Sequence, residues 1–443
     1  MSLKEKVDKK EASICIVGVG FVGLPLSVHF AKKGFRVFGF DVDGDKVKSM
    51  SSGKDPTNEV GDDELKKTIK ENDLSFTDVP EKIKEADFVI VSVPTPIDES
   101  KKPFLKYIEK ASETVGKNLK KGSIVVLESS VYPGVTEEVV KPIIEKESGL
   151  MCDVDFGLGY SPERINPGDA DHSLTGVIKI VSGSDEKTCD ILSDLYGKIV
   201  KAGIYKAKDI RTAEAAKIIE NIQRDLNIAL VNELAIIFEK MGIDVYEVLK
   251  AAESKWNFHS YRPGLVGGHC IPVDPYYLVH KARGLGYNPK IILSGREIND
   301  YMPVHVSELV IDALRKNNTK TRRASVLLMG LAFKKNVGDI RNSPSKVLIE
   351  KLKSKGINVF GYDPLVSKEM LRKEFGIDII SDLGDLGNEK IDCIVLVTDH
   401  DIFKDLTTNQ IKNIMNSKPI VIDTRRFFDK DEMQKNGFEY TGL

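Results

Sequence analysis

Short apolar runs alternate with helix-like stretches in the N-terminal part of the chain. Residues 13–17 form a run rich in Ile and Val, a glycine turn follows, and residues 35–41 (FRVFGFD) form the next run. Further strand-like runs lie at 87–94, 122–130 and 177–183. This alternation predicts a parallel sheet covered by helices on both faces, with right-handed crossovers. We place this first domain at residues 1–205.

One long helix is expected in the middle of the chain. The segment from Thr212 to Met241 contains neither Gly nor Pro, and Gly242 after it is a natural helix end. Its apolar residues cover more than one stripe of the helix, which is typical of burial on several sides. We expect this helix to bridge two domains and to contribute to a homodimer interface, within a mainly helical region at residues 206–318.

The C-terminal part repeats the α/β pattern. Strand-like runs lie at 324–333, 357–364, 391–400 and 418–425, with helices between them. The predicted fold class is therefore α/β, with two doubly wound Rossmann-like domains joined by the long central helix and a helical dimerisation region. The last domain is placed at residues 319–443.

Composition narrows the range of functions. The 65 Lys and Arg residues against 67 Asp and Glu residues give a net charge of −2, which argues against nucleic acid as a partner. Five cysteines without CxxC spacing argue against a disulfide framework and against a zinc site. The charged N-terminus has no apolar signal region, and no apolar run approaches the ~18 residues that span a bilayer. The expected compartment is a reducing cytoplasm, without a membrane as partner.

A glycine-rich turn forms the first candidate site. Gly18-Val19-Gly20-Phe21-Val22-Gly23 matches GxGxxG, directly after a predicted strand and before a helix. Its glycines suit a tight turn, close approach of the backbone to a pyrophosphate and close helix–strand packing. Asp41 ends the second strand, where a carboxylate can bind both ribose hydroxyls and repel a 2′-phosphate. The prediction is NAD rather than NADP, although a glycine turn in an unrelated α/β domain is the alternative.

The second candidate site surrounds Cys270, in the sequence GGHCIPVDP from Gly267 to Pro275. The two glycines let the backbone approach a ligand, and the two prolines stiffen the segment. A Cys on a rigid loop near the carboxylate of Asp274 suits nucleophilic catalysis, the alternative being a buried Cys that acts as a small apolar residue. A metal site of His269, Cys270 and Asp274 lacks a further ligand, so no metal is predicted and His269 is expected to be structural.

Cations and an amide form two weaker candidate sites. Lys217 and Asn221 are one turn apart on the long helix, so they share a face and need polar partners such as a substrate oxyanion, unless that face is solvated. Lys334 and Arg341 follow the first strand of the last domain, where they are placed to bind phosphate or are ordinary surface cations. Arg262, after Tyr261, offers a further guanidinium just before the cysteine loop.

Together these segments closely resemble the UDP-glucose/UDP-N-acetylhexosamine 6-dehydrogenase family, from about residue 13 to residue 425. The motifs that agree in order and spacing are GVGFVG, SVPTP (92–96), ESSVYPG (128–134), SPER (161–164), AEAAKIIEN (213–221), NE (232–233), RPGLVGGHCIPVDPYYL (262–278) and GLAFKKNVGDIRNSPS (330–345). The resemblance implies an NAD domain, a central helical dimerisation region and a UDP-sugar domain. It also implies a four-electron oxidation at C6 through a thiohemiacetal and a thioester.

The resemblance assigns roles to residues that match the motifs. Cys270 would be the nucleophile, Lys217 and Asn221 would stabilise the oxyanion, and Asp274 with Lys217 would move protons through water. Glu163 would activate the hydrolytic water, and Ser130 would lie near the C6 hydroxyl. Cofactor contacts are expected from Gly18, Gly20, Phe21, Val22, Gly23, Asp41, Lys46, Thr95, Ser130 and the segment from Glu128. Substrate contacts are expected from Glu163, Arg164, Lys217, Asn221, Tyr261, Gly267, Lys334, Arg341 and Arg262, the last in the partner subunit's site.

Departures from the family pattern bear on the substrate. SPER is followed by INPGD, so Pro167 stands where the glucose-oxidising branch has a second Glu. INPGD, RPGLVGGHC and the sequence of the long helix resemble the N-acetylhexosamine branch. The expected substrate is therefore UDP-N-acetyl-glucosamine or -galactosamine, followed by UDP-N-acetylmannosamine and then UDP-glucose. A two-electron dehydrogenase of the hydroxyacid type, or a catalytically silent sensor, are the alternatives of other kinds.

Overall fold

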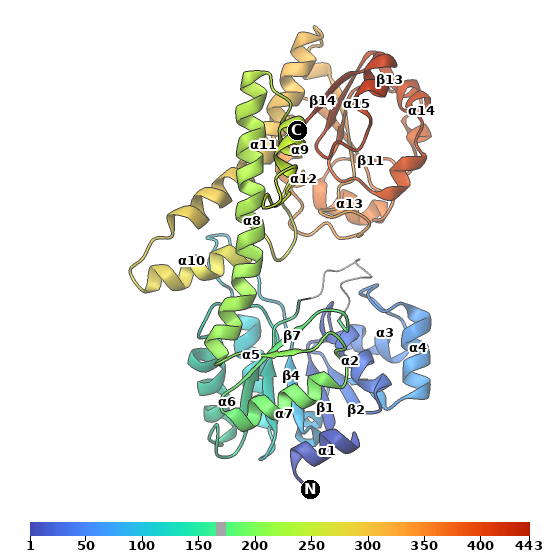
Figure 1. Cartoon of the computed structure of the whole chain (residues 1–443). Coiled ribbons are helices and arrows are strands. Elements are labelled where there is room, and N and C mark those ends of the chain that lie inside the picture. The colour runs from blue at the N-terminus through green and yellow to red at the C-terminus, as the bar shows by residue number, and fades with distance from the viewer. Residues whose placement is uncertain (165–173) are drawn as a thin grey trace. The chain divides into compact units, whose positions relative to one another are not determined.

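The computed structural model describes residues 1–164 and 174–443, so Pro167 lies outside the described residues. Within them the chain forms two compact units (Figure 1). The first unit contains Met1–Glu220 and Tyr276–Tyr287, and the second contains Asn221–Pro275 and Asn288–Leu443. Each unit is built around its own sheet, which confirms the predicted α/β class with two Rossmann-like sheets. The division into three domains at residues 205 and 318 stays a prediction.

The sheet of the first unit has the strand order β3-β2-β1-β4-β5-β6-β7-β8. Its strands are β1 (Ser13–Val17), β2 (Arg36–Phe40), β3 (Leu74–Thr77), β4 (Phe88–Val91), β5 (Ile124–Leu127), β6 (Gly157–Tyr160), β7 (Lys179–Gly183) and β8 (Ile204–Lys206). Neighbouring strands are parallel except β6 and β7, which are antiparallel. The predicted parallel arrangement therefore holds for every neighbouring pair in this sheet except β6 and β7.

Helices cover both faces of this sheet. They are α1 (Leu3–Lys9), α2 (Gly23–Lys32), α3 (Gly44–Ser51), α4 (Asp62–Glu71), α5 (Lys106–Asn118), α6 (Lys141–Ser148) and α7 (Glu186–Gly197). Every residue of β1 is buried: Ile14 and Ile16 pack into one apolar cluster, and Cys15 and Val17 into another. Alternate residues of a strand point to opposite faces, so a continuous apolar run is what a doubly covered strand requires.

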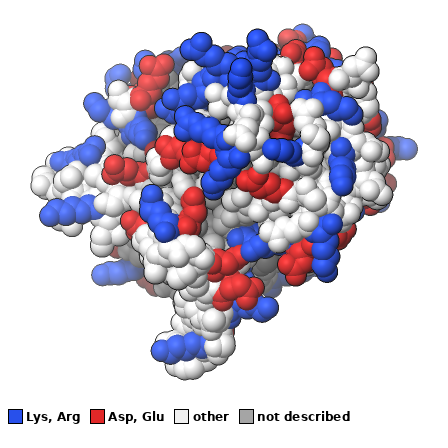
Figure 2. Space-filling view, turned by 90° about the horizontal axis from the view of Figure 1, so that it is seen from above, with Lys and Arg blue, Asp and Glu red and all other residues white. Residues whose placement is uncertain are grey.

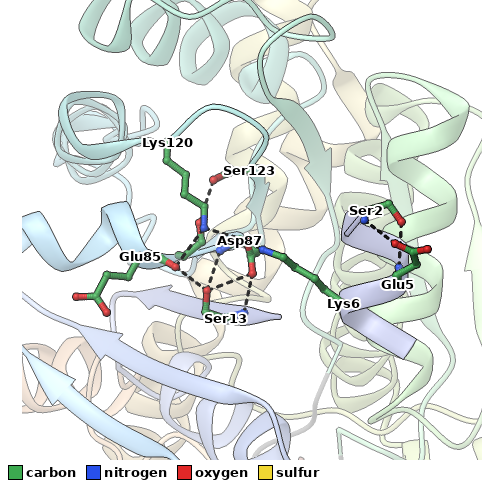
Figure 3. Close-up of polar contacts among 9 residues, drawn as sticks. Ser2, Glu5, Lys6, Ser13, Glu85, Asp87, Lys120 and Ser123 are labelled. Carbon is green, nitrogen blue, oxygen red and sulfur yellow. Dashed lines mark hydrogen bonds and ion pairs between the residues drawn. The ribbon is translucent and has the colours of Figure 1, made fainter. Parts of the chain in front are cut away.

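A buried carboxylate closes the amino edge of the first sheet (Figure 3). Asp87, just before β4, accepts hydrogen bonds from Lys6 of α1 at 2.7 Å and from Lys120 at 2.8 Å. The Ser13 N–H donates to it as well, at 3.0 Å. Burial by itself raises the pKa of Asp87, but these donors outweigh burial and hold the pKa below its usual value. Lys6 and Lys120 therefore tie α1 and the segment before β5 to the central strands.

The sheet of the second unit is parallel throughout, in the order β11-β10-β9-β12-β13-β14. Its strands are β9 (Ser325–Met329), β10 (Asn358–Tyr362), β11 (Asp378–Ile379), β12 (Ile391–Leu396), β13 (Met415–Asp423) and β14 (Glu439–Gly442). The flanking helices are α12 (Ser345–Ser354), α13 (Lys368–Phe375), α14 (Thr408–Asn413) and α15 (Lys430–Lys435). In both sheets the order reverses beside the first strand, and ligands bind α/β sheets at the carboxyl edge of such a reversal.

The long helix is present as α8 (Ile210–Met241), two residues longer than predicted at its N-terminus. It is followed by α9 (Val245–Glu253), α10 (Asp274–Gly284) and α11 (Lys290–Lys316). Several large apolar residues of α8 remain exposed in this chain: Ile219, Leu230, Ile237 and Met241. An apolar stripe of this kind is typical of a surface that binds another protein.

Charge is mixed over the face of the molecule shown in Figure 2. Figure 2 shows acidic and basic side chains interspersed over one face, with Lys and Arg gathered towards its upper edge. This agrees with the near-zero net charge of the sequence. Among the helices of the described residues, none is long and apolar enough to cross a lipid bilayer.

Candidate active site

The glycine turn joins β1 to α2 at the carboxyl edge of the first sheet. Gly18 has φ +90°, and a Cβ at Gly23 would lie 2.1 Å from the Gly18 carbonyl oxygen, so both positions require glycine. A Cβ at Gly20 would meet no atom within 4 Å, so a side chain at this position would extend into the open space beside the turn. Phe21 is exposed and Val22 is the N-cap of α2. These features fit a pyrophosphate at the helix N-terminus.

Asp41 directly follows β2 and faces this turn. Its carboxylate accepts the Val19 N–H at 3.1 Å and the Lys46 ammonium at 2.6 Å. The first bond fixes the carboxylate beside the glycine turn, where a ribose would lie in a dinucleotide site. The structure thus pairs Asp41 with Lys46, and their predicted role as cofactor contacts stays a prediction.

Three more predicted residues follow neighbouring strands at the same edge. Thr95 comes after β4, Ser130 after β5 and Glu163 after β6, and all three are partly exposed. The Ser129 hydroxyl donates to the Val93 carbonyl at 2.7 Å, which ties the segments after β4 and β5 together. Arg164 forms an ion pair with Glu220 of α8 at 2.7 Å, which fixes the position of its guanidinium.

A buried lysine that the sequence analysis missed lies behind these segments. Lys179 opens β7, and because β7 runs antiparallel to β6, its first residue lies at the carboxyl edge. Its ammonium donates to the Pro162 carbonyl at 3.1 Å and lies 3.2 Å from Glu128 and 3.7 Å from Glu163. The Tyr196 hydroxyl also donates to Glu128, at 2.5 Å. Burial raises the pKa of Glu128 despite the attraction of Lys179.

Helix α8 carries the Lys–Asn pair. Lys217 and Asn221 are both buried, which contradicts the alternative of a solvated helix edge. One turn before Lys217, the buried carboxylate of Glu214 accepts the Gly134 N–H at 2.5 Å and the Thr136 hydroxyl at 2.7 Å. Burial raises the pKa of Glu214 to about 7. These bonds fix the N-terminal part of α8 to the end of the ESSVYPG motif and to the residues just after it.

Cys270 is the exposed one of the five cysteines, all of which are free. The other four are buried, and burial raises the pKa of Cys152 to about 11 and that of Cys15 further. The Cys270 carbonyl accepts the N–H of Asp274 at 2.8 Å, so the cysteine precedes α10 by one turn. The alternative of a buried, purely apolar Cys270 is therefore wrong.

Asp274 connects the cysteine turn to helix α8. Its side chain is 3% exposed, and it accepts a hydrogen bond from the Asn221 amide at 2.6 Å. A carboxylate and an amide thus meet one turn from the exposed thiol, within the second unit. A buried carboxylate of this kind, fixed by a short hydrogen bond, suits a role in moving protons.

The cysteine loop and the loop after β9 interlock. A Cβ at Gly267 would lie 2.6 Å from Pro344, and a Cβ at Gly268 (φ +92°) would lie 2.5 Å from the Phe333 ring. The Gly268 carbonyl accepts the Asn342 amide at 3.3 Å. The two glycines are therefore required because the GLAFKK segment packs directly on the cysteine loop. This contact brings together the predicted cysteine site and the predicted phosphate site, which are far apart in the sequence.

Lys334 and Arg341 lie at the reversal of strand order in the second sheet. Gly330, with φ +75°, directly follows β9, and a Cβ there would lie 2.2 Å from the Thr398 carbonyl after β12. This tight crossing opens the segment that carries Lys334, which is partly buried. Arg341 is exposed, and both its Nε (3.0 Å) and its Nη2 (2.8 Å) donate to Asp339.

Tyr261 and Arg262 lie just before the cysteine loop. Tyr261 packs against the apolar cluster of Val231, Ala235, Val245 and Leu249. The Arg262 guanidinium contacts Glu253 of the same chain and stacks over the Tyr246 ring at 5.6 Å. Arg262 and Ser260 lower the pKa of Glu253 to about 2. The expected reach of Arg262 into a partner subunit stays a prediction.

Two more residues hold the cysteine loop: Asn232, which belongs to the NE motif but was given no role, and Arg425, which the sequence analysis did not name. The Asn232 amide of α8 donates to the Gly264 carbonyl at 3.1 Å and accepts the Gly264 N–H at 2.8 Å. Arg425, after β13, donates to the Leu265 carbonyl at 3.2 Å. A polar residue in an apolar stretch is the signal that could have indicated Asn232, as it could have indicated Lys179 in β7. Arg425 gives no such signal.

The described side chains were also compared with the ligand groups that hold metal ions. Within residues 1–164 and 174–443, no three His, Cys, Asp or Glu side chains form a group suited to a metal ion. His269 instead contacts the carboxylate of Asp339, with Nε2 and Oδ2 2.8 Å apart.

Comparison with known proteins agrees with this architecture along the whole chain. The models of the UDP-glucose/GDP-mannose dehydrogenase family match three segments: the NAD binding domain at residues 12–200, the central domain at 211–301 and the UDP binding domain at 327–430. A Pseudomonas aeruginosa protein named UDP-N-acetyl-D-glucosamine 6-dehydrogenase is 47% identical over 423 residues, covering 96% of this chain and 99% of that protein. A Salmonella typhi protein of the same name is 47% identical over 94% of this chain and 96% of its own length.

A solved structure has a similar fold over nearly the whole chain. The UDP-D-ManNAc dehydrogenase of Pyrococcus horikoshii matches with a TM-score of 0.86 at 33% identity, covering 97% of this chain and 99% of that one. A dinucleotide-type glycine turn after β1 and an exposed cysteine loop packed on the loop after β9 are typical of a nicotinamide-dependent oxidoreductase acting on a UDP-sugar. The chain belongs to the UDP-glucose/GDP-mannose dehydrogenase family.

Proposed function

We propose that this protein uses NAD to oxidise the C6 alcohol of UDP-N-acetylglucosamine to the uronate in two successive two-electron steps. The observation that supports it most is the exposed Cys270 one turn from the buried Asn221–Asp274 hydrogen bond, in a member of this family. A two-electron dehydrogenase has no use for such a thiol. A four-electron oxidation needs one, because covalent capture prevents loss of the half-oxidised aldehyde.

The chain's own residues would divide the work between binding and chemistry. When bound, the nicotinamide accepts one hydride in each oxidation, so two dinucleotides are reduced per sugar. Gly18, Gly20, Gly23 and Asp41 would hold the dinucleotide, since their geometry suits its pyrophosphate and ribose. Lys334 and Arg341 would hold the UDP phosphates, since cations at the carboxyl edge of a parallel sheet are suited to this.

The Cys270 sulfur would hold the sugar between the two oxidations. Oxidation of the C6 alcohol yields an aldehyde and a proton, and the Cys270 sulfur then adds to the carbonyl carbon while Asn221 and Lys217 stabilise the oxyanion. The second oxidation of this thiohemiacetal yields a thioester on Cys270. Water then adds to the acyl carbon and passes one proton to the Glu163 carboxylate. The carbon–sulfur bond breaks, and the second proton of the water passes to the departing sulfur, which leaves the uronate and the Cys270 thiol. Asp274 would exchange protons with Lys217 through water.

The choice of sugar rests on the comparison of relatives. The two relatives named UDP-N-acetyl-D-glucosamine 6-dehydrogenase are 47% identical to this chain, whereas a UDP-N-acetyl-D-mannosamine dehydrogenase of Methanocaldococcus jannaschii is 34% identical. The acetamido group is shared by these substrates, so the difference lies in the configuration of the ring. UDP-N-acetylgalactosamine, which belongs to the same expected group, is the next substrate to test.

The working form would be a homodimer in a reducing cytoplasm. The exposed apolar residues of α8 support a subunit interface, and Arg262, which is 42% exposed at its side chain, would complete the partner's substrate site. All five cysteines are free, which suits a compartment that keeps thiols reduced.

The decisive experiment counts NADH per sugar. With limiting UDP-N-acetylglucosamine, two NADH should form per sugar consumed, measured by absorbance. The same assay is run with UDP-N-acetylgalactosamine, UDP-N-acetylmannosamine and UDP-glucose. Cys270→Ser should stall after the first oxidation or accumulate an ester adduct, with kcat lower by several orders of magnitude. Cys189→Ser, which changes a buried thiol, is the matched control and should retain kcat. One NADH per sugar, or full uronate yield from Cys270→Ser at the normal rate, would contradict the proposal.

A further inference from the structure

Asp339 belongs to the segment that the proposed function assigns to phosphate binding, and it contacts the cysteine loop through His269. Its carboxylate is 13% exposed at the side chain. Oδ1 accepts the backbone N–H and the Nε of Arg341, both at 3.0 Å, and Oδ2 accepts Nη2 of the same guanidinium at 2.8 Å. Nε and Nη2 form a two-pronged bond, which fixes the plane of the guanidinium as well as its position.

The same carboxylate holds the residue next to the nucleophile. His269 Nε2 lies 2.8 Å from Asp339 Oδ2, and since the ionised carboxylate can only accept, Nε2 is the donor. The imidazole also meets the Phe333 ring edge-to-face, with centroids 5.7 Å apart. His269 thus contacts a carboxylate and a ring, both from the segment after β9. Its backbone continues directly into Cys270.

We propose that Asp339 is a positioning residue with two arms: it orients Arg341 for the UDP diphosphate, and through His269 it fixes the backbone that presents the Cys270 thiol. The proposal deepens the proposed function and rests on its assignments of Arg341 and Cys270. It accounts for the close packing of Gly267 and Gly268 on Phe333 and Pro344, since the two loops act as one rigid support.

The effect of Asp339 on phosphate binding has two opposing parts. As an anion near Arg341, the carboxylate repels a diphosphate, but this repulsion is screened by solvent at a guanidinium that is 51% exposed. As a partner, it orders a long side chain that would otherwise lose much conformational freedom on binding. We expect ordering to outweigh repulsion, so that Asp339→Asn binds UDP about fivefold more weakly.

Two double-mutant cycles test the two arms without turnover. UDP affinity is measured by calorimetry, and the alkylation rate of Cys270 by iodoacetamide is followed by peptide mass spectrometry. Asp339→Asn should weaken UDP binding about fivefold in the parent protein but less than twofold in an Arg341→Ala background. It should raise the alkylation rate about threefold in the parent but less than twofold in a His269→Ala background.

The matched control is Asp401→Asn, which changes another ion-paired carboxylate of the second unit. Asp401 pairs with Lys335 at 2.9 Å and Lys404 at 2.6 Å, and its variant should leave both measurements within twofold. If Asp339→Asn does not fold, Asp339→Glu, which keeps the charge and displaces it, takes its place in both cycles. The proposal is overturned if either variant leaves both quantities unchanged, or if its effects persist undiminished in the Arg341→Ala and His269→Ala backgrounds. Absence of NADH formation from any UDP-sugar would contradict the proposed function and leave both cycles readable.

Discussion

Removal of the Asn232 amide should loosen the cysteine loop from helix α8. Asn232 is fully buried and forms three hydrogen bonds: two with the backbone of Gly264, at 3.1 and 2.8 Å, and one to Asn299 Oδ1 at 2.8 Å. Asn232→Ala leaves the buried N–H and C=O of Gly264 and the Asn299 oxygen without this partner. Each buried polar group left unpaired costs about 1–3 kcal/mol.

The three losses are not independent, because Gly264 can relax once it is released. We therefore expect Asn232→Ala to lower the free energy of unfolding by about 3–5 kcal/mol, near the upper end for a single substitution. Urea denaturation followed by circular dichroism measures this value. The loop six residues before Cys270 should also become more mobile, and the alkylation rate of Cys270 in the folded variant should rise.

Asn227→Ala is the matched control for this experiment. Asn227 lies on the same helix, and its amide donates to the Gln223 carbonyl of that helix at 2.7 Å. Because that bond spans one turn and anchors no loop, the control should lose less than about 1 kcal/mol and leave the alkylation rate unchanged. Equal losses in the two variants would refute the view that Asn232 anchors the cysteine loop.

Three further changes have clear expected outcomes. Asp41→Ala should raise the KM for NAD about tenfold or more and improve the use of NADP, because Lys46 would lose its partner and attract a 2′-phosphate; a preference of the unmodified protein for NADP would contradict this. Lys179→Met should lower the unfolding free energy by about 3–5 kcal/mol in chemical denaturation, since it leaves Glu128 buried without its cation, whereas Lys179→Arg should lose far less. The pKa of Asp87 is lowered on folding, so its stabilisation is present above the unfolded pKa of about 4 and is lost as pH falls through the folded pKa. Asp87→Asn should therefore cost about 2 kcal/mol at pH 7 and flatten the acid limb of the stability profile; an unchanged acid limb would show that Asp87 does not contribute to it.

Much of the architecture follows from local pattern. The continuous apolar runs of β1 and β9 are doubly buried strands, and the segment without Gly or Pro is α8, within two residues of the expected start. The antiparallel direction of β7 could not be predicted in this way, because it depends on the end of the sheet at which the chain enters the strand. A run such as VIKIVSG has the same composition in either direction.

The glycine turn, the carboxylate after the second strand and the cysteine loop can be recognised in the sequence, because each depends on backbone freedom or side-chain chemistry within a few residues. Three other features depend on the folded chain: Asp274 meets Asn221, Asp339 holds both Arg341 and His269, and Lys179 lies among the carboxylates at the carboxyl edge. These partners come from segments far apart in the chain. Their meeting is fixed by sheet order and loop packing, which leave no periodic trace in the sequence.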